Sequence, residues 1–277
     1  LTDFSAELVT WLADGLGLPL ELAADVSYPG HSVPRCHTVP SRTGAELLDH
    51  LVKRARRHPR IDWLTPARLV AARTSGEGVR AAVVEFPDGT REEVPTRALL
   101  LATNGYGADS DLVRDLMPEI ADAVYHGGEN SRGDALRIGR ALGAATGFLD
   151  AYQGHAALAK GAGTLVGWAT IMHGGVLVNA EGRRFGDETV GYSEYAAMLA
   201  AQPGSTGWII FDQRVCDLCS AFGDFRDTLA QGVVLSADDA PSLARTCGLP
   251  ADQLVRTLDE ADRCARGETG DPWGRPF

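Results

Sequence analysis

An apolar run that leads into glycines is the first place in this sequence where nucleotide chemistry could occur. Residues 98–102 are followed by Gly105-Tyr106-Gly107, which nearly matches the GxGxxG turn that brings backbone amides close to a pyrophosphate. The match fails at the last glycine, which is Ser110. The alternative is an ordinary strand-ending turn that uses glycine for a positive φ. No complete GxGxxG follows a strand elsewhere, so we expect no pyrophosphate site within this chain alone.

The pair Cys216 and Cys219 forms a CxxC, a spacing found in redox-active thiols and in half of a zinc site. A thiol oxidoreductase would need both thiols exposed at a helix N-terminus beside a positive charge, and the intervening Asp217 disfavours this. No second CxxC or HxxxH accompanies the pair, so no metal site is predicted. Five cysteines at irregular spacing do not indicate a disulfide framework. We expect two packed cysteines on adjacent turns of one helix.

Composition restricts the class of protein. The net charge of −11 repels a phosphate backbone, so nucleic acid is not an expected partner. No apolar stretch approaches the roughly 20 residues that span a bilayer, and the N-terminus lacks the basic-then-apolar order of a secretion signal. With 277 residues and 44% hydrophobic content, the chain can bury one large or two modest cores. We predict a cytoplasmic protein without a membrane partner.

Hydrophobic periodicity divides the chain into two predicted domains, residues 1–107 and 108–277. In the first, a helix that ends at Gly17 presents Leu8, Trp11, Leu12 and Leu16 on one face. A second helix, capped by Ser41 or Thr43, turns Leu47, Leu48, Leu51 and Val52 inward. Strands are predicted over 69–72, 79–86 and 92–94, with a turn at 87–90, and a fully buried fourth strand over 98–102.

The second predicted domain mixes short helices with short strands, which indicates an α+β domain of its own. Helices are predicted over 137–142, 193–201, 241–247 and 251–265. Strands are predicted over 175–178 and 208–211. Gly143 ends the first of these helices, and residues 179–182 form a turn after the first strand.

Five segments resemble, in the right order, the flavoproteins of the fumarate reductase and succinate dehydrogenase superfamily, which includes 3-ketosteroid and tricarballylate dehydrogenases. The resemblance spans about residues 29–212 and includes the family's LATGG(F/Y)G strand and turn at 98–107. The other segments are Val33-Pro34-Arg35-Cys36-His37 with Thr43-Gly44, Gly133-Asp134-Ala135 with Gly143-Ala144, Gln153-Gly154-His155, and Gly174-Gly175-Val176-Leu177-Val178-Asn179 with Arg184-Phe185 and Glu188.

This resemblance implies an α/β plus α+β fold class: part of a Rossmann-like FAD-binding domain with an inserted α+β capping domain. It implies FAD as cofactor and an oxidoreductase in which hydride moves between flavin N5 and a substrate carbon next to a carbonyl or carboxylate. The family's N-terminal GxGxxG unit and C-terminal closing segment are not found here. We therefore expect a central, incomplete and inactive portion, with an electron donor or acceptor of unknown identity. The alternative is a flavin-free binding or regulatory module.

The resemblance also assigns site residues. His155 matches the histidine that binds a substrate carboxylate or carbonyl, a role suited to a side chain that donates a hydrogen bond and carries charge near pH 7. Asp134 matches a flavin-contacting aspartate, and capping of the next helix is the compatible alternative. The remaining implied cofactor contacts are the backbone of Ala102, Thr103, Asn104 and Gly105, and Leu69 or Val70 beside the adenine.

Two departures from the family indicate a different substrate. Fumarate reductases carry a threonine–glutamate pair about a dozen residues after the histidine, where this chain has Gly167 and Trp168. Tyr192 stands where they carry a proton-delivering arginine, and tyrosine can also transfer a proton. We predict Tyr192 and His155 as catalytic, with Gly167, Trp168 and Glu188 as further substrate residues. A cyclic ketone or a substituted acid would suit this pocket better than a C4 dicarboxylate.

Overall fold

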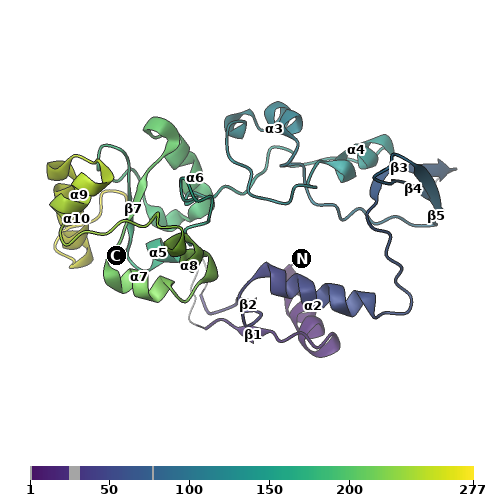
Figure 1. The fold of residues 1–277 in the computed structure, drawn as a ribbon, viewed down its shortest axis with the longest axis horizontal. Helices are drawn as coiled ribbons and strands as arrows, with labels where there is room; N and C mark the ends of the chain where they lie inside the picture. Colours follow the sequence, from purple (N-terminus) through teal and green to yellow (C-terminus); the bar gives the residue numbers. More distant parts are fainter. Residues whose placement is uncertain (1, 25–31, 77) are drawn as a thin grey trace. The chain divides into compact units, whose positions relative to one another are not determined.

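The computed structural model describes residues 2–24, 32–76 and 78–277. The beginning of the resembling stretch, residues 29–31, lies outside the described residues. Two compact units make up the chain (Figure 1): the first combines Leu1–His58 with Gln153–Phe277, and the second is Pro59–Tyr152. These units describe compactness only, so the division into domains 1–107 and 108–277 stays a prediction.

The second unit contains the predicted β-meander. Its antiparallel sheet has the order β3 (Arg68–Ser75), β4 (Gly78–Glu85) and β5 (Arg91–Pro95) (Figure 1). The central strand β4 contributes the buried side chains of Ala81, Val83 and Val84. The Asp88 carboxylate accepts hydrogen bonds from the backbone N–H and the hydroxyl of Thr90, which closes the turn. The three strands and this turn are confirmed.

The predicted buried strand over 98–102 is wrong. The structure has no strand there, and Leu100 is 89% exposed. A strand needs a neighbour that satisfies its backbone groups, and no described strand pairs with this segment. The apolar residues of this segment would be buried only if another layer covered them. The described residues contain no such layer.

Residues 103–143 of the second unit form a loop and short helices. The helices are α3 (Ser110–Leu116), η3 (Pro118–Ile120) and α4 (Asp134–Ala141). Asp109 caps α3 by accepting a hydrogen bond from the Leu112 N–H over 3.0 Å. The predicted helix over 137–142 is confirmed and begins three residues earlier, at Asp134. Gly143 follows it with φ +80°, the conformation that commonly ends a helix.

The N-terminal part of the first unit contains helices and one small sheet. Its elements are η1 (Thr2–Phe4), α1 (Ser5–Thr10), η2 (Trp11–Gly15), β1 (Glu21–Leu22), which pairs with β2 (His37–Thr38), and α2 (Gly44–Arg56). The Thr43 hydroxyl accepts from the Glu46 N–H, while the Glu46 carboxylate accepts from the Ser41 N–H, so both proposed caps contribute. The inward position predicted for Leu48 is wrong, because its side chain is 60% exposed.

The remainder of the first unit, residues 153–277, has a two-stranded sheet covered by helices. Its elements are α5 (Ala169–Met172), β6 (Val176–Val178), η4 (Glu188–Val190), α6 (Tyr192–Ala200), η5 (Pro203–Ser205), β7 (Trp208–Ile210), α7 (Gln213–Cys219), α8 (Gly223–Ala230), α9 (Ala240–Cys247) and α10 (Ala251–Ala265). The predicted helices and strands of this region are confirmed to within one or two residues at each end. No helix of the described residues is long and apolar enough to cross a membrane.

The antiparallel β6–β7 sheet separates two cores because side chains alternate along a strand. Val176 and Val178 pack with α9 and α10, which lie side by side (Figure 1). Leu177, between them, packs instead with Trp168 and Tyr195 in the second core. The sheet thereby connects the C-terminal helix pair to the aromatic residues that the sequence indicated as site residues.

A buried carboxylate, that of Glu188, is hydrogen-bonded to strand β6. Glu188 is 0% exposed, and its oxygens accept hydrogen bonds from the Leu177 N–H (3.1 Å), from two Arg184 nitrogens (2.9 and 2.7 Å) and from Arg275 Nη1 (3.0 Å). Arg275 also donates to the Gly175 carbonyl over 2.9 Å. Every expected acceptor position of the carboxylate is therefore used within the protein.

Asp271 completes this buried network from the C-terminal segment. It accepts a hydrogen bond from Arg184 Nη1, and both side chains are almost completely buried. Burial raises the pKa of the Asp271 carboxyl, but the hydrogen bond and charge of Arg184, together with the backbone N–H groups of Arg275 and Trp273, outweigh burial and hold the pKa below its usual value. Burial lowers the pKa of Arg184, and Glu188 and Asp271 more than reverse this. Two arginines thus face two carboxylates.

Replacing Glu188 by Gln should destabilise the protein strongly. The variant leaves Arg184 and Arg275 buried without their shared carboxylate, which costs about 3–5 kcal/mol when a buried pair is broken. The matched control is Glu93→Gln, since Glu93 pairs with Arg73 at the surface, where both side chains are more than half exposed, and should cost at most about 1 kcal/mol. Urea unfolding measures both. Equal losses would show that the Glu188 network contributes no more than a surface pair.

The contribution of Asp271 should depend on pH. Its pKa is lower in the folded protein, so its stabilisation is present above the unfolded value of about 3.9 and is lost as pH falls through the folded value. The destabilisation caused by Asp271→Asn should therefore be largest at neutral pH and shrink in acid. Unfolding curves of both proteins between neutral and acidic pH test this. A difference that stays constant over that range would contradict the assignment.

Candidate active site

The two residues predicted as catalytic lie against each other in the first unit. The rings of His155 and Tyr192 stack with their centroids 4.8 Å apart and an angle of 24° between their planes. Backbone hydrogen bonds hold this arrangement: the Ala156 N–H donates to the Tyr192 carbonyl over 3.1 Å, and the Gly154 N–H donates to the Ser193 hydroxyl over 3.2 Å. The loop that carries His155 therefore runs beside the start of α6.

Hydrogen bonds orient both polar groups of this pair. Gln153 Nε2 donates to the Tyr192 hydroxyl oxygen over 2.8 Å. The Ala157 N–H donates to His155 Nδ1 over 3.2 Å. Because Nδ1 accepts, the proton of the neutral imidazole is on Nε2, which becomes the donor of the ring. His155 is thus arranged as a hydrogen-bond donor, and the Tyr192 hydroxyl oxygen accepts a hydrogen bond from Gln153.

Trp168 packs beside these residues in the core. It is 4% exposed, and its ring meets Tyr192 edge to face at 6.4 Å and 70°. Tyr195 supports it from behind at 5.9 Å. Gly167 precedes it, and its carbonyl accepts a hydrogen bond from the Thr170 hydroxyl at the start of α5. The structure thus brings three predicted residues together, His155, Tyr192 and Trp168, with Gly167 adjacent in sequence.

Glu188 differs from the other predicted substrate residues. Its carboxylate is fully buried and its acceptor positions are taken by Arg184, Arg275 and the Leu177 N–H. It therefore has no acceptor position left for a substrate, and the geometry gives it a structural place instead. Sequence reasoning missed this because its partner Arg275 lies 87 residues away, in a C-terminal segment without a recognised motif.

The two cysteines of the CxxC are packed rather than reactive. Cys216 lies in the middle of α7 and Cys219 is its last residue, and Cys219 is 1% exposed. Burial raises the pKa of the Cys219 thiol to about 11. Burial and the neighbouring Asp217 also raise the pKa of Cys216. The interpretation as packed cysteines on one helix is confirmed, and these properties contradict a thiol oxidoreductase.

Several residues predicted to contact the cofactor meet in the second unit. The Thr103 hydroxyl accepts from the Ala135 N–H over 3.2 Å, and the Gly105 carbonyl accepts from the Gly133 N–H over 3.1 Å. Asn104, between them, has φ +65°, and residues 102–105 are all exposed. The loop therefore presents polar backbone at the N-terminus of α4. Such an exposed backbone turn fits the polar part of a dinucleotide.

Asp134 is joined to strand β3 by an arginine that the sequence did not single out. Arg68 Nε and Nη2 donate to the two Asp134 oxygens over 3.0 and 2.5 Å. Asp134 is the first residue of α4 and does not cap it, because Gly133 occupies the cap position without a side-chain bond. Arg68 occupies one acceptor position on each oxygen, so the carboxylate can still accept a hydrogen bond from a hydroxyl group. Asp134 thus fits a contact with the ribityl chain.

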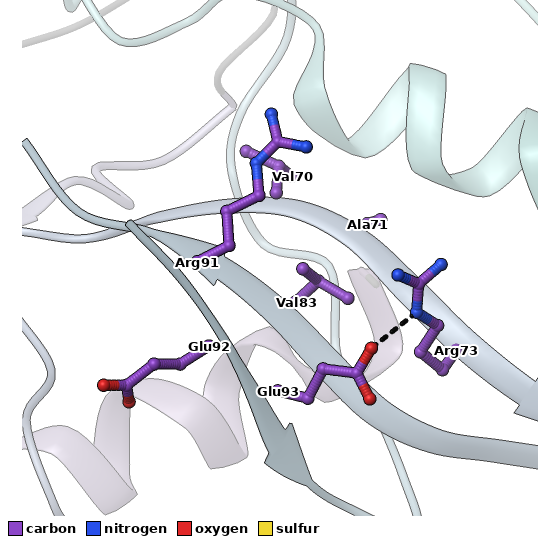
Figure 2. A pocket seen from close by; sticks show the side chains of 7 residues that line it. All are labelled: Val70, Ala71, Arg73, Val83, Arg91, Glu92 and Glu93. Atoms are coloured by element: carbon purple, nitrogen blue, oxygen red, sulfur yellow. Dashed lines mark hydrogen bonds and ion pairs between the residues drawn. The ribbon is translucent and has the colours of Figure 1, made fainter. Parts of the chain in front are cut away.

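Leu69 and Val70, the predicted adenine wall, follow Arg68 on β3 and are half-buried. Val70 lines a hollow of about 310 Å³ on the meander, with Val83 as an apolar neighbour. Figure 2 shows this hollow and the hydrogen bond of 2.7 Å from Arg73 to Glu93 beside it. The hollow offers apolar surface bordered by charged groups, which suits the edge of a flat heterocycle.

Comparison with known proteins identifies the family. A family model described as an FAD binding domain matches residues 1–277. A probable fumarate reductase of Shewanella frigidimarina is 26% identical over 264 residues, covering 94% of this chain and 44% of that protein. A fumarate reductase of Schizosaccharomyces pombe is 28% identical over 299 aligned positions, covering 100% of this chain and 56% of its own. The chain therefore spans about half the length of these relatives.

Solved structures show the same fold. The open conformation of a flavocytochrome c3 fumarate reductase has a TM-score of 0.73 at 24% identity, over 99% of this chain and 48% of that one. A 3-ketosteroid-Δ4-(5α)-dehydrogenase from Rhodococcus jostii has a TM-score of 0.67 at 19% identity, over 99% and 62%. The mixed helix-and-sheet architecture is thus an FAD-binding fold. The chain belongs to the FAD binding domain family and, within it, to the fumarate reductase and succinate dehydrogenase flavoproteins that its motifs resemble.

Proposed function

We propose that the protein is an FAD-dependent oxidoreductase that reduces or dehydrogenates a carbon–carbon bond next to a carbonyl or carboxylate. The observation that carries this proposal is the stacked pair His155 and Tyr192, which are positions that the motifs associate with substrate chemistry. FAD, when bound, supplies hydride exchange at N5. The capping role of residues 108–277 is part of the same proposal.

The cofactor would be held by the residues gathered in the second unit. The exposed backbone of 102–105 provides donors and acceptors for polar groups of FAD. Asp134, held in place by Arg68, would accept a hydrogen bond from a hydroxyl of the ribityl chain. Leu69 or Val70 would form the apolar surface beside the adenine. These roles follow from the chemistry of the donors and acceptors present.

His155 and Tyr192 have different roles toward the substrate: one donates a hydrogen bond and the other transfers a proton. His155 donates a hydrogen bond from Nε2 to the carbonyl oxygen, because its Nδ1 is already an acceptor for the Ala157 N–H. This polarises the carbonyl and makes the carbon next to it exchange its proton more readily. Tyr192 gives or takes that proton through its hydroxyl. The two groups come from segments bonded to each other, so their spacing is preorganised.

The pocket residues favour a bulky or weakly charged substrate. Tyr192 is half-buried and is backed by the buried Trp168, so the positions where fumarate reductases have a polar pair and an arginine carry no charged group here. Flat aromatic surface contacts a ring well and offers no charge to a carboxylate. We therefore place cyclic ketones first and substituted acids second. Fumarate, the substrate named for the relatives, is the comparison compound.

The proposal is tested on the full-length protein purified from cells. Its visible absorption spectrum should show bound flavin. If the enzyme is a reductase, the anaerobically reduced protein should be reoxidised faster by cyclohex-2-en-1-one than by fumarate. If it is a dehydrogenase, it should transfer electrons from cyclohexanone to dichlorophenolindophenol. Tyr192→Phe should lower turnover about 10²–10⁴-fold, the usual contribution of a proton-transferring side chain, with unchanged flavin content.

The matched control is Tyr125→Phe, which removes a hydroxyl that hydrogen-bonds to the Gly128 carbonyl in an exposed part of the second unit. It should leave turnover unchanged. Full activity in Tyr192→Phe would remove Tyr192 from the mechanism. A protein that contains no flavin, and binds none when FAD is added, would refute the oxidoreductase and support a flavin-free binding module.

A further inference from the structure

Gln153 makes a contact that no motif assigns. Its Nε2 donates to the Tyr192 hydroxyl oxygen over 2.8 Å, across 39 positions of sequence. The hydrogen bonds from Gly154 to Ser193 and from Ala156 to Tyr192 fix the backbones on both sides of this contact. The contact is therefore held in place by the backbone hydrogen bonds between these two segments. It does not depend on the two side chains alone.

The polarity of this hydrogen bond determines where the phenol proton points. An amide nitrogen only donates, so the Tyr192 oxygen accepts in this bond and its own O–H is directed elsewhere. His155 and Trp168 contact the ring of Tyr192 from its face and its edge, and neither contact sets the direction of the hydroxyl proton. Gln153 is thus the residue that sets which way the proton faces.

We propose that Gln153 is a positioning residue for Tyr192: it holds the phenol oxygen as an acceptor, so that the O–H faces the substrate. The inference rests on the function proposed above and extends it by one residue. In a reduction for which FAD, when bound, would supply a hydride to one alkene carbon, Tyr192 gives its proton to the neighbouring carbon. The phenolate that remains keeps the hydrogen bond from Gln153, and water returns the proton. Dehydrogenation reverses each transfer.

The decisive variant is Gln153→Glu in the full-length flavoprotein. Glutamate has the same shape but offers an acceptor where the amide donates, so the Tyr192 O–H turns toward it and away from the substrate. With cyclohex-2-en-1-one as the probe, kcat should fall about 100-fold, within the range for loss of proton transfer, while KM and flavin content stay near wild type. Gln153→Met removes the hydrogen bond without supplying an acceptor, and should lower kcat less.

The control variant is Gln213→Glu. Gln213 is also exposed and donates its amide to Asp217 over 2.7 Å, so the change in charge and the loss of one hydrogen bond are matched. Its kcat should equal that of wild type. A second measurement is the ¹³C resonance of tyrosine Cζ, assigned by its loss in Tyr192→Phe. It should move in Gln153→Glu and Gln153→Met, and stay in place in Gln213→Glu, because the Cζ shift responds to the hydrogen bonds of the phenol oxygen.

The outcomes separate this inference from the proposed function. If wild type turns over the probe, Tyr192→Phe is slow and Gln153→Glu is as fast as wild type, the positioning role is overturned and the function stands. An unmoved Cζ resonance in Gln153→Glu also overturns it, since the hydrogen bond is then absent. If flavin-loaded wild type acts on none of cyclohex-2-en-1-one, fumarate and cyclohexanone, the function fails before any variant is compared, and the positioning role fails with it.

Discussion

The burial of the Glu188 carboxylate is the constraint on which the rest of the first unit depends. An ionised carboxylate removed from water is costly unless hydrogen bonds and opposite charge replace its hydration. Four hydrogen bonds do so here, from β6, from Arg184 and from Arg275. Because Arg275 also donates to the carbonyls of Gly175 and Ile171, one carboxylate holds the C-terminal segment, β6 and α5 in a single arrangement.

This network also sets the position of the proposed acid or base. Tyr192 begins α6 only four residues after Glu188, and the intervening Gly191 has φ +112°, a conformation that favours glycine. Phe185, next to Arg184, packs on Tyr195 of the same helix with centroids 5.1 Å apart. The Arg-Phe and Glu positions of the family motif therefore have packing reasons in this chain. The proposed proton transfer is assigned to Tyr192, just after them.

Local signals predicted local structure well, and contacts between distant residues were beyond them. The Thr43 cap, the turn at 87–90 and helix α10 depend on neighbouring residues, so the pattern was sufficient. The segment 98–102 was misjudged because burial of an apolar run depends on a covering layer elsewhere. The pairing of His155 with Tyr192 could be expected from family positions. Nothing in the pattern indicated that the Gln153 amide would reach Tyr192 or that Arg275 would reach Glu188.

Charge balance supplies the final argument for the substrate class. The buried cations of this unit, Arg184 and Arg275, are matched by two carboxylates, Glu188 and Asp271. Their sum is zero, so they provide no net positive charge for a substrate carboxylate. Tyr192, in place of an arginine, is a neutral group as well. A dicarboxylate would therefore gain no ion pair from these two arginines, while its loss of hydration would cost about several kcal/mol per charge. A ketone, the substrate class proposed here, would need only the hydrogen bond that His155 is arranged to give.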